Sequence, residues 1–160
     1  MQIDIRPEHH WLSNLIGKWT MEAEMDMGPE QPKLITKGTE EVRALGEAWI
    51  VCEGEGEEAE CGMGLSQFTL GFDPSQNCFV GTFLSSKMTY LWIYENGRLD
   101  DAGKVLTLDA TGPSFTGEGT ARYQDMIEII EDGHRTLKSQ VLDENEVWHH
   151  FMTAHYYRQG

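Results

Sequence analysis

Polar and apolar side chains alternate without interruption over residues 18–27. The apolar side chains occupy the odd-numbered positions, namely Trp19, Met21, Ala23, Met25 and Met27, and charged residues or threonine occupy the even-numbered ones. Successive side chains of a β-strand point to opposite faces, so this period of two predicts a strand with one buried face and one solvated face. The segment is the strongest local indication that the chain is a β protein.

Further strand candidates follow at intervals of about 10–15 residues. They are the segments 33–45, 48–54, 65–72, 78–85, 90–94, 105–110, 120–130, 135–142 and 147–157. Short segments between them have the composition of tight hairpin turns: 73–77, 95–97, 131–133 and 143–145. One helix is predicted before the first strand, over residues 7–16, because Pro7 suits a first helical turn and apolar side chains recur with helical spacing up to Gly17.

Strands joined by short connections, with no helices between them, form an antiparallel sheet. An open antiparallel sheet of about ten strands would curl and would expose two edges, whereas closure removes the edges. We therefore expect an all-β fold, an antiparallel up-and-down barrel over residues 18–158 with a short N-terminal helix. Because no linker or change of composition divides the chain, residues 1–160 are predicted to form one domain. Barrels slightly wider than about eight strands enclose room for a ligand.

The charge of the chain argues against several classes of partner. The formal net charge is −15, and the 12 Lys and Arg residues are scattered. Nucleic-acid binding requires a clustered cationic surface, and an anionic membrane would repel the chain, so neither partner is expected. No segment reaches the roughly 18 apolar residues of a spanning helix, and residues 1–7 lack the features of a signal peptide. We therefore expect a cytoplasmic location, with the oligomeric state open between monomer and homodimer.

Acidic and cysteine residues do not predict a metal site. The run from Glu53 to Glu60 contains five glutamates, but its alternation with glycine and alanine fixes no geometry, and we interpret it as a solvated loop. The three cysteines show no CxxC spacing, which argues against a disulfide framework and against a structural zinc site. Cys61 follows the acidic run and is expected to be exposed.

The junction between the predicted helix and the first strand resembles a known signature. Gly17-Lys18-Trp19 is similar to the Gly-x-Trp motif of lipocalin and calycin barrels, in which an Arg or Lys of the last strand packs against the tryptophan. Arg158 stands where that partner would be. A guanidinium over an indole face gains cation–π energy, so we expect Gly17, Trp19 and Arg158 to close one end of the barrel.

A second resemblance covers most of the chain. The segments 70–73, 79–86, 106–108 and 156–158 look like those of the domain of unknown function 1579 (DUF1579), a family of uncharacterised bacterial proteins. The resemblance implies a lipocalin-like barrel and supplies no activity. Where that family usually has Asp-Ser, this chain has Ser85-Ser86, so any chemistry that the acid performs elsewhere in the family is missing here.

The last predicted strand carries the most suggestive functional residues. If Arg158 faces inward, a period of two places Met152, His150 and Trp148 inside the barrel and His149 outside. An inward His150 would orient the polar end of a ligand, bind a haem or act as a general base. The alternative is a core histidine satisfied by one hydrogen bond.

Further side chains are candidates for lining a pocket. The chain is rich in methionine, whose flexible side chain adapts to varied ligands, and Trp92 and Tyr94 share one face of their strand. Glu40 and Arg122 lie in step with apolar positions, so we expect inward charges that recognise a polar head group. A β-bulge that turns either residue outward remains an alternative.

Three functions of different classes follow from these residues. We expect the first, which is binding of a small apolar or amphipathic molecule inside the barrel without catalysis and without a cofactor. Its predicted ligand-binding residues are Trp92, Tyr94, His150, Met152, Glu40 and Arg122. The second is a haem-binding or enzymatic barrel that uses His150. The third is an interaction module whose interior is filled by its own side chains.

Overall fold

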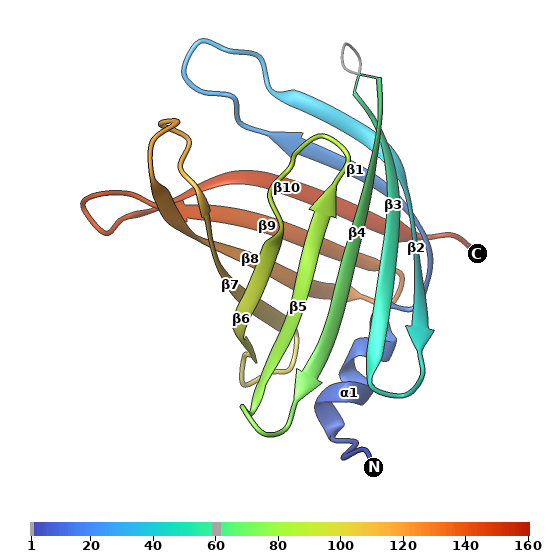
Figure 1. Cartoon of the computed structure of the whole chain (residues 1–160). Helices are drawn as coiled ribbons and strands as arrows, with labels where there is room; N and C mark the ends of the chain where they lie inside the picture. Colours follow the sequence, from blue (N-terminus) through green and yellow to red (C-terminus); the bar gives the residue numbers. More distant parts are fainter. Residues whose placement is uncertain (1, 59–61) are drawn as a thin grey trace.

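A computed structural model describes residues 2–58 and 62–160, and within them the chain forms a closed antiparallel barrel preceded by a short helix (Figure 1). The helix α1 spans Pro7–Leu12, and a 3-10 turn follows over Ser13–Leu15. The strands are β1 Gly17–Met25, β2 Leu34–Leu45, β3 Trp49–Glu58, β4 Gly62–Asp73, β5 Cys78–Ser85, β6 Trp92–Leu99, β7 Val105–Pro113, β8 Thr120–Glu131, β9 His134–Leu142 and β10 Trp148–Arg158. The predicted all-β barrel of ten strands with one short N-terminal helix is confirmed.

The strands pair in the order of the sequence, and the pairing of β1 with β10 closes the barrel. In that pair Trp19 lies opposite Arg158, and Met25 lies opposite Met152. The period of two predicted over residues 18–27 is confirmed as far as Met25, because the apolar residues are buried or part-buried and the polar residues between them are exposed. The prediction is wrong for Met27, which lies beyond the strand and is 51% exposed. Antiparallel neighbours that lie directly opposite share a face of the sheet, so the register shows which side chains point into the barrel.

The two ends of the barrel differ. The closed end carries α1 and the turns that follow β2, β4, β6 and β8, whereas the open end carries the loops that follow the odd-numbered strands (Figure 1). Two hydrogen bonds fix α1 across the closed end. Trp11 Nε1 donates to the Gly103 carbonyl at 2.7 Å, and the His9 ring bonds through Nε2 to the Phe72 carbonyl at 2.9 Å. Leu12 is 1% exposed as a result.

The predicted helix over residues 7–16 is too long. The α-helix ends at Leu12, a tighter 3-10 turn continues to Leu15, and Ile16 is already extended. Gly17 then adopts a φ of 139°, which glycine tolerates because it has no Cβ. The early end lets the chain turn from the barrel's closed end directly into β1.

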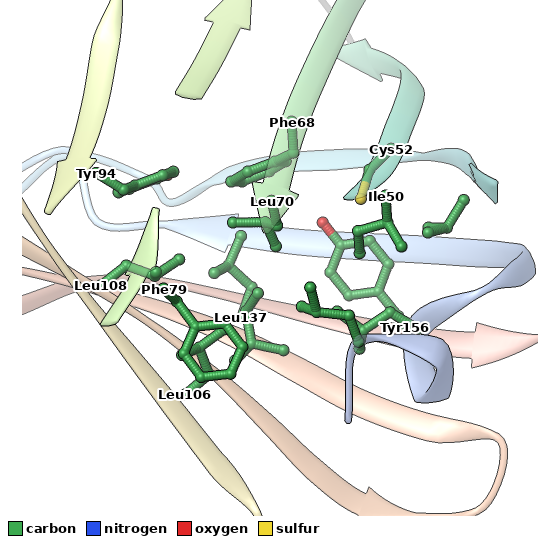
Figure 2. Close-up of a cluster of buried hydrophobic side chains, with 14 of the residues drawn as sticks. Ile50, Cys52, Phe68, Leu70, Phe79, Tyr94, Leu106, Leu108, Leu137 and Tyr156 are labelled. Atoms are coloured by element: carbon green, nitrogen blue, oxygen red, sulfur yellow. The ribbon is translucent and has the colours of Figure 1, made fainter. Parts of the chain in front are cut away.

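The main core fills the half of the barrel next to α1. Leu70, Leu106 and Leu108 are at most 1% exposed, and the strands around them contribute further apolar side chains (Figure 2). These are Ile50, Cys52, Phe72, Phe79, Ile127, Leu137 and Tyr156. Burying a large apolar side chain contributes about 1.5–3 kcal/mol. The closed half therefore supplies much of the fold's stability.

The first part of the acidic run belongs to a strand and not to a loop. β3 continues to Glu58, and Glu53, Glu55 and Glu57 are exposed on its outer face while the glycines between them face the interior. The sequence-based interpretation failed because alternation with glycine is also a period of two. Glu60 and Cys61, the latter predicted to be exposed, lie outside the described residues.

The predicted turn at 95–97 is also wrong. β6 runs through these residues to Leu99, and its pairing with β7 shifts register between Glu95 and Arg98. Asn96 has a φ of 50°, typical of a β-bulge residue with turn-like conformation. The actual turn follows Leu99, where the Asp100 side chain accepts hydrogen bonds from the backbone of Lys104 and Val105. The turns at 73–77, 131–133 and 143–145 lie where they were predicted.

Candidate functional site

The interior of the barrel is packed in the closed half and accessible in the open half. Side chains that point inward near α1 are buried. By contrast, inward-facing residues nearer the open end keep part of their surface accessible to solvent: Met21, Ala23, Met25, Thr36, Ser66, Phe83, Ser85, Trp92, Asp125 and Met152. We call the space between these side chains the open-half cavity. It is the candidate functional site.

One side of the open-half cavity is lined by small residues. Ala23 of β1 lies opposite Ala154 and Thr36, and further along the barrel Gly56 lies opposite Gly64. A hollow of about 130 Å³ adjoins this side, with Met21, Ser66, Ser85 and Tyr156 also in its lining. Small side chains on adjacent strands leave room that large ones would fill.

The opposite side of the cavity is aromatic. Tyr94 stacks on Phe68 with the ring centroids 6.0 Å apart, and Phe83 lies 4.6 Å from Phe68. Nearer the open end, Trp92 packs edge-on against Tyr123 at 4.9 Å. Trp92 and Tyr94 come from alternate positions of β6, so the predicted shared face is the inward one. The cavity thus combines large flat apolar surfaces with open space.

A carboxylate lies at the base of the aromatic side. Asp125 of β8 accepts a hydrogen bond from the Tyr94 hydroxyl on one oxygen and from the Ser139 hydroxyl on the other, each at 2.5 Å. Burial raises the pKa of Asp125 above its ordinary value, although the two hydrogen bonds act in the opposite direction. Burial and the neighbouring Asp125 raise the pKa of the Tyr94 hydroxyl. Met152 lies directly opposite Ser139 in the register of β9 and β10, and so lies beside this group.

A second buried polar group lies among the side chains of the closed-half core. Glu40 is 6% exposed and forms an ion pair with Arg135, which is 4% exposed. The Arg135 guanidinium also lies 4.6 Å from the Trp19 ring and 4.0 Å from the Tyr156 ring. The inward position predicted for Glu40 is confirmed.

The inward position predicted for Arg122 is wrong. Arg122 is exposed on the outer face of β8, opposite Thr111, and the guanidinium that meets Glu40 belongs to Arg135. The inward residues of β8 are Tyr123, Asp125 and those that follow in step with them. Apolar residues occur in both phases of this strand, so the alternation alone did not distinguish its faces.

The predicted facing of His150 is also wrong. Its ring accepts or donates a hydrogen bond with the Thr153 hydroxyl at 2.8 Å, its side chain is exposed, and it lies opposite Gln140 on the outer face. A register shift between His150 and Met152 marks a β-bulge that reverses the facing of the residues before it. Met152 keeps the inward position that was predicted, whereas Trp148 and His150 do not. The prediction for His149 is also wrong, because this exposed residue lies opposite Val141, on the face that Val141 shares with Tyr123.

The predicted closure of the barrel by Gly17, Trp19 and Arg158 agrees with the geometry. The Arg158 guanidinium carbon lies 4.3 Å from the Trp19 ring centroid. The same guanidinium donates to the Ile16 carbonyl at 2.6 Å and to the Asn14 carbonyl at 3.0 Å. A Cβ on Gly17 would collide with Arg158, so the glycine allows the close approach.

Asp125, Ser139 and Arg135 were not among the predicted site residues. The sequence does hold a signal for the first of them, because Asp125 is a lone acid in step with Tyr123 and Ile127. A charged residue in step with apolar ones indicates an inward charge. Arg135 carries the same signal, because it is in step with Leu137 and Val141. Ser139 carries none, since its position inside the barrel depends on the register of β9 with both neighbours.

A hollow of about 630 Å³ lies against β1 to β5 and is lined mostly by residues of their outer face. Its lining includes Glu41, Glu53 and Glu55 with Lys18, and it is broad and open. Over residues 2–58 and 62–160, no group of three or more His, Cys, Asp or Glu side chains is arranged to hold a metal ion. In the same part of the chain, no helix has the length and apolar character needed to cross a bilayer.

Solved structures of similar fold cover almost the whole chain. Rv2717c from M. tuberculosis has a TM-score of 0.62 at 13% identity, with 98% of this chain and 100% of that chain covered. The S-type phycobiliprotein lyase CPES from Guillardia theta has a TM-score of 0.65 at 11% identity, with coverage of 98% and 94%. A de novo designed fluorescence-activating β-barrel has a TM-score of 0.51 at 10% identity, with coverage of 92% and 95%. At these identities the likeness concerns the fold alone.

No curated protein matches the sequence. The model of the family described as "Protein of unknown function (DUF1579)" matches residues 4–158, which is nearly the entire chain. The resemblance inferred from the sequence segments is therefore confirmed, together with the lipocalin-like barrel that it implied. The chain belongs to the DUF1579 family.

Proposed function

We propose that the protein binds a small amphipathic molecule in the open-half cavity. The observation that carries this proposal is the contrast between the two halves of the barrel. The inward-facing residues next to α1 form the buried core, whereas most of those near the open end, apart from Tyr123 and Ala110, keep part of their surface accessible. A barrel that served only as a filled scaffold would gain stability from larger side chains at Ala23 and Ser66. Ligand sites are typically concave and mostly apolar, with a few polar groups that fix orientation.

Different lining residues offer different kinds of contact to a bound molecule. Trp92, Phe83 and Met152 offer apolar contact, and aromatic rings supply large rigid contact surfaces at low conformational cost. Tyr94 and Asp125 present polar atoms at the inner end of the cavity. Glu40 is occupied by Arg135, so we assign it the role of shaping the inner end of the cavity.

Related barrels support this proposal at the level of the fold. Neighbours of similar fold include a phycobiliprotein lyase and EF1p2_mFAP2b, which was solved bound to DFHBI and has a TM-score of 0.50 at 11% identity. The haem alternative depended on His150, whose ring lies outside the barrel. A haem in the cavity would find no ligand at that residue.

Nile red, a neutral dye whose fluorescence shifts in apolar surroundings, tests the proposal. We expect the wild-type protein to bind the dye with blue-shifted emission. Ala23→Trp fills the cavity and should weaken dye binding by about tenfold or more. Thr20→Trp, on the exposed face of the same strand, is the matched control and should bind the dye as the wild type does.

Two results would overturn the proposal. One is the absence of dye binding to a folded wild-type protein. The other is equal binding by the Ala23→Trp and Thr20→Trp variants, because the dye would then bind outside the cavity. Thermal unfolding of all three proteins verifies that each is folded.

A further inference from the structure

The acid inside the barrel has no cationic partner. The charged side chains whose inward position is described are Glu40, Asp125 and Arg135, with Arg158 at the closed end. Arg135 is paired with Glu40, and Arg158 is bonded to the carbonyls of Ile16 and Asn14. Asp125 belongs to none of the ion pairs between described residues. The described interior therefore carries one uncompensated carboxylate.

Asp125 keeps free sites at which it can accept further hydrogen bonds. Each of its oxygens accepts one hydroxyl, from Tyr94 or from Ser139, and these two bonds fix the plane of the carboxylate. An ionised carboxylate has about four acceptor sites, so each oxygen retains one. Asp125 keeps part of its surface accessible although it lies inside the barrel.

We infer that the ligand of the open-half cavity carries a protonated amine at its buried end and that Asp125 binds this amine. The inference rests on the proposed function and specifies the chemical class of the ligand. A buried charge is stable only when it is paired or coordinated, and a ligand cation provides the missing pair. A charge-assisted N–H···O bond is roughly twice as strong as a neutral one.

The surroundings of Asp125 favour an organic cation over a metal ion. Aromatic rings line the same side of the cavity, including the stacked pair of Phe68 and Tyr94. The face of an aromatic ring attracts an ammonium group, whereas a hard metal ion requires several oxygen ligands around it. The net charge of −15 also raises the local concentration of cations at the protein.

Burial and a bound cation have opposite effects on the pKa of Asp125. The pKa of Asp125 is raised because burial disfavours the ionised form. A positive charge bound beside the carboxylate would stabilise that form and lower its pKa. Binding of the amine therefore relieves a cost that the unliganded fold carries.

Displacement of Nile red by matched eight-carbon compounds tests the inference. The probes are octylammonium, 1-octanol and octanoate, which share a chain and differ in the polar group. We expect octylammonium to displace the dye at about tenfold lower concentration than 1-octanol, and octanoate to be the weakest competitor. The preference should persist in about 0.5 M NaCl, where attraction to the net charge of the whole protein is screened.

Two variants test whether Asp125 causes the preference for octylammonium. Asp125→Asn removes the charge and keeps a polar group between the two hydroxyls, so it should bind Nile red but lose the preference for octylammonium. Glu128→Gln makes the same change of charge three residues later, on the outer face of β8, and should keep the preference. Unfolding curves establish that both variants fold.

The outcomes separate the inference from the proposed function. If the dye binds and is displaced from the cavity, but the amine and the alcohol compete equally, the inference is wrong and the proposed function stands. The inference also fails if Asp125→Asn and Glu128→Gln retain the same preference. If Asp125→Asn does not fold, the wild-type ratio in high salt decides. If the wild type binds no dye, both proposals fall.

Discussion

At the scale of single residues, Asp125 links stability to pH. Its folded pKa lies above 3.8, so the folded state holds this proton more tightly than the unfolded state does. Stability from this group is therefore fully present at low pH and is lost as the pH rises from about 3.8 through the folded pKa. Each pKa unit of difference corresponds to about 1.4 kcal/mol.

Asp125→Asn removes this titration. We expect the variant to gain stability relative to the wild type as the pH rises through that window, since its amide needs no proton to remain neutral. Urea unfolding of both proteins over a series of pH values measures the difference in free energy. If the difference in the free energy of unfolding does not change with pH, the pKa of Asp125 is not raised in the folded state. Glu128→Gln serves as the control.

The ion pair between Glu40 and Arg135 leads to a second prediction at this scale. Both side chains are nearly fully buried, so removing one partner leaves the other charge buried and unpaired. Glu40→Leu or Arg135→Met alone should cost about 3–5 kcal/mol in the free energy of unfolding. The double variant should recover most of that loss, because two apolar side chains of similar size need no partner.

A double-mutant cycle by urea denaturation makes the measurement. Losses that simply add in the double variant would contradict the prediction, because they would mean that each side chain is stabilised independently. The contacts of Arg135 with the rings of Trp19 and Tyr156 would then be the main stabilising interactions.

At the scale of elements, the close approach of β2 to β3 depends on a glycine. A Cβ on Gly38 would overlap the Glu55 carbonyl oxygen of the neighbouring strand, which is backbone and cannot move aside. Gly38→Ala should therefore destabilise the protein by about 1–3 kcal/mol or more. Gly64→Ala is the control, because a Cβ there would come nearest to the flexible Lys87 side chain, at 3.3 Å, and would lie 3.7 Å from the Gly56 carbonyl oxygen, which is an ordinary contact distance. Equal thermal stability of the two variants would contradict this account.

The elements also show how far sequence reasoning extends. The period of two gave the strands and the inward face of β1 correctly, because one of its faces is apolar and the other polar throughout. It failed in β10, where the bulge after His150 reverses the facing of the residues before it. It failed in β8, where both faces contain apolar residues. Bulges and registers depend on the neighbouring strand, which a single segment does not encode.

At the scale of the whole molecule, the two halves of the barrel have different roles. The closed half is covered by α1 and holds the side chains that are least exposed, including Leu12, Leu70 and Leu106. The open half holds the accessible cavity with Asp125 at its inner end. Binding loops and cavities are generally drawn from the less stable parts of a fold. On the proposed function, a ligand taken up at the open end would leave the closed-half core undisturbed.

Hydrogen exchange measures this division directly. Amides of the strand segments beside α1, such as 70–72 and 106–108, should exchange only through global unfolding, because their side chains are packed on all sides. Amides at the open ends of the strands, such as 21–25 and 62–66, should exchange faster through local opening. Saturating Nile red should slow exchange in the second group and leave the first unchanged, since a ligand stabilises the states that it binds. Uniform protection along all strands, or protection by the dye at the closed end, would contradict the assignment of stability to one half and binding to the other.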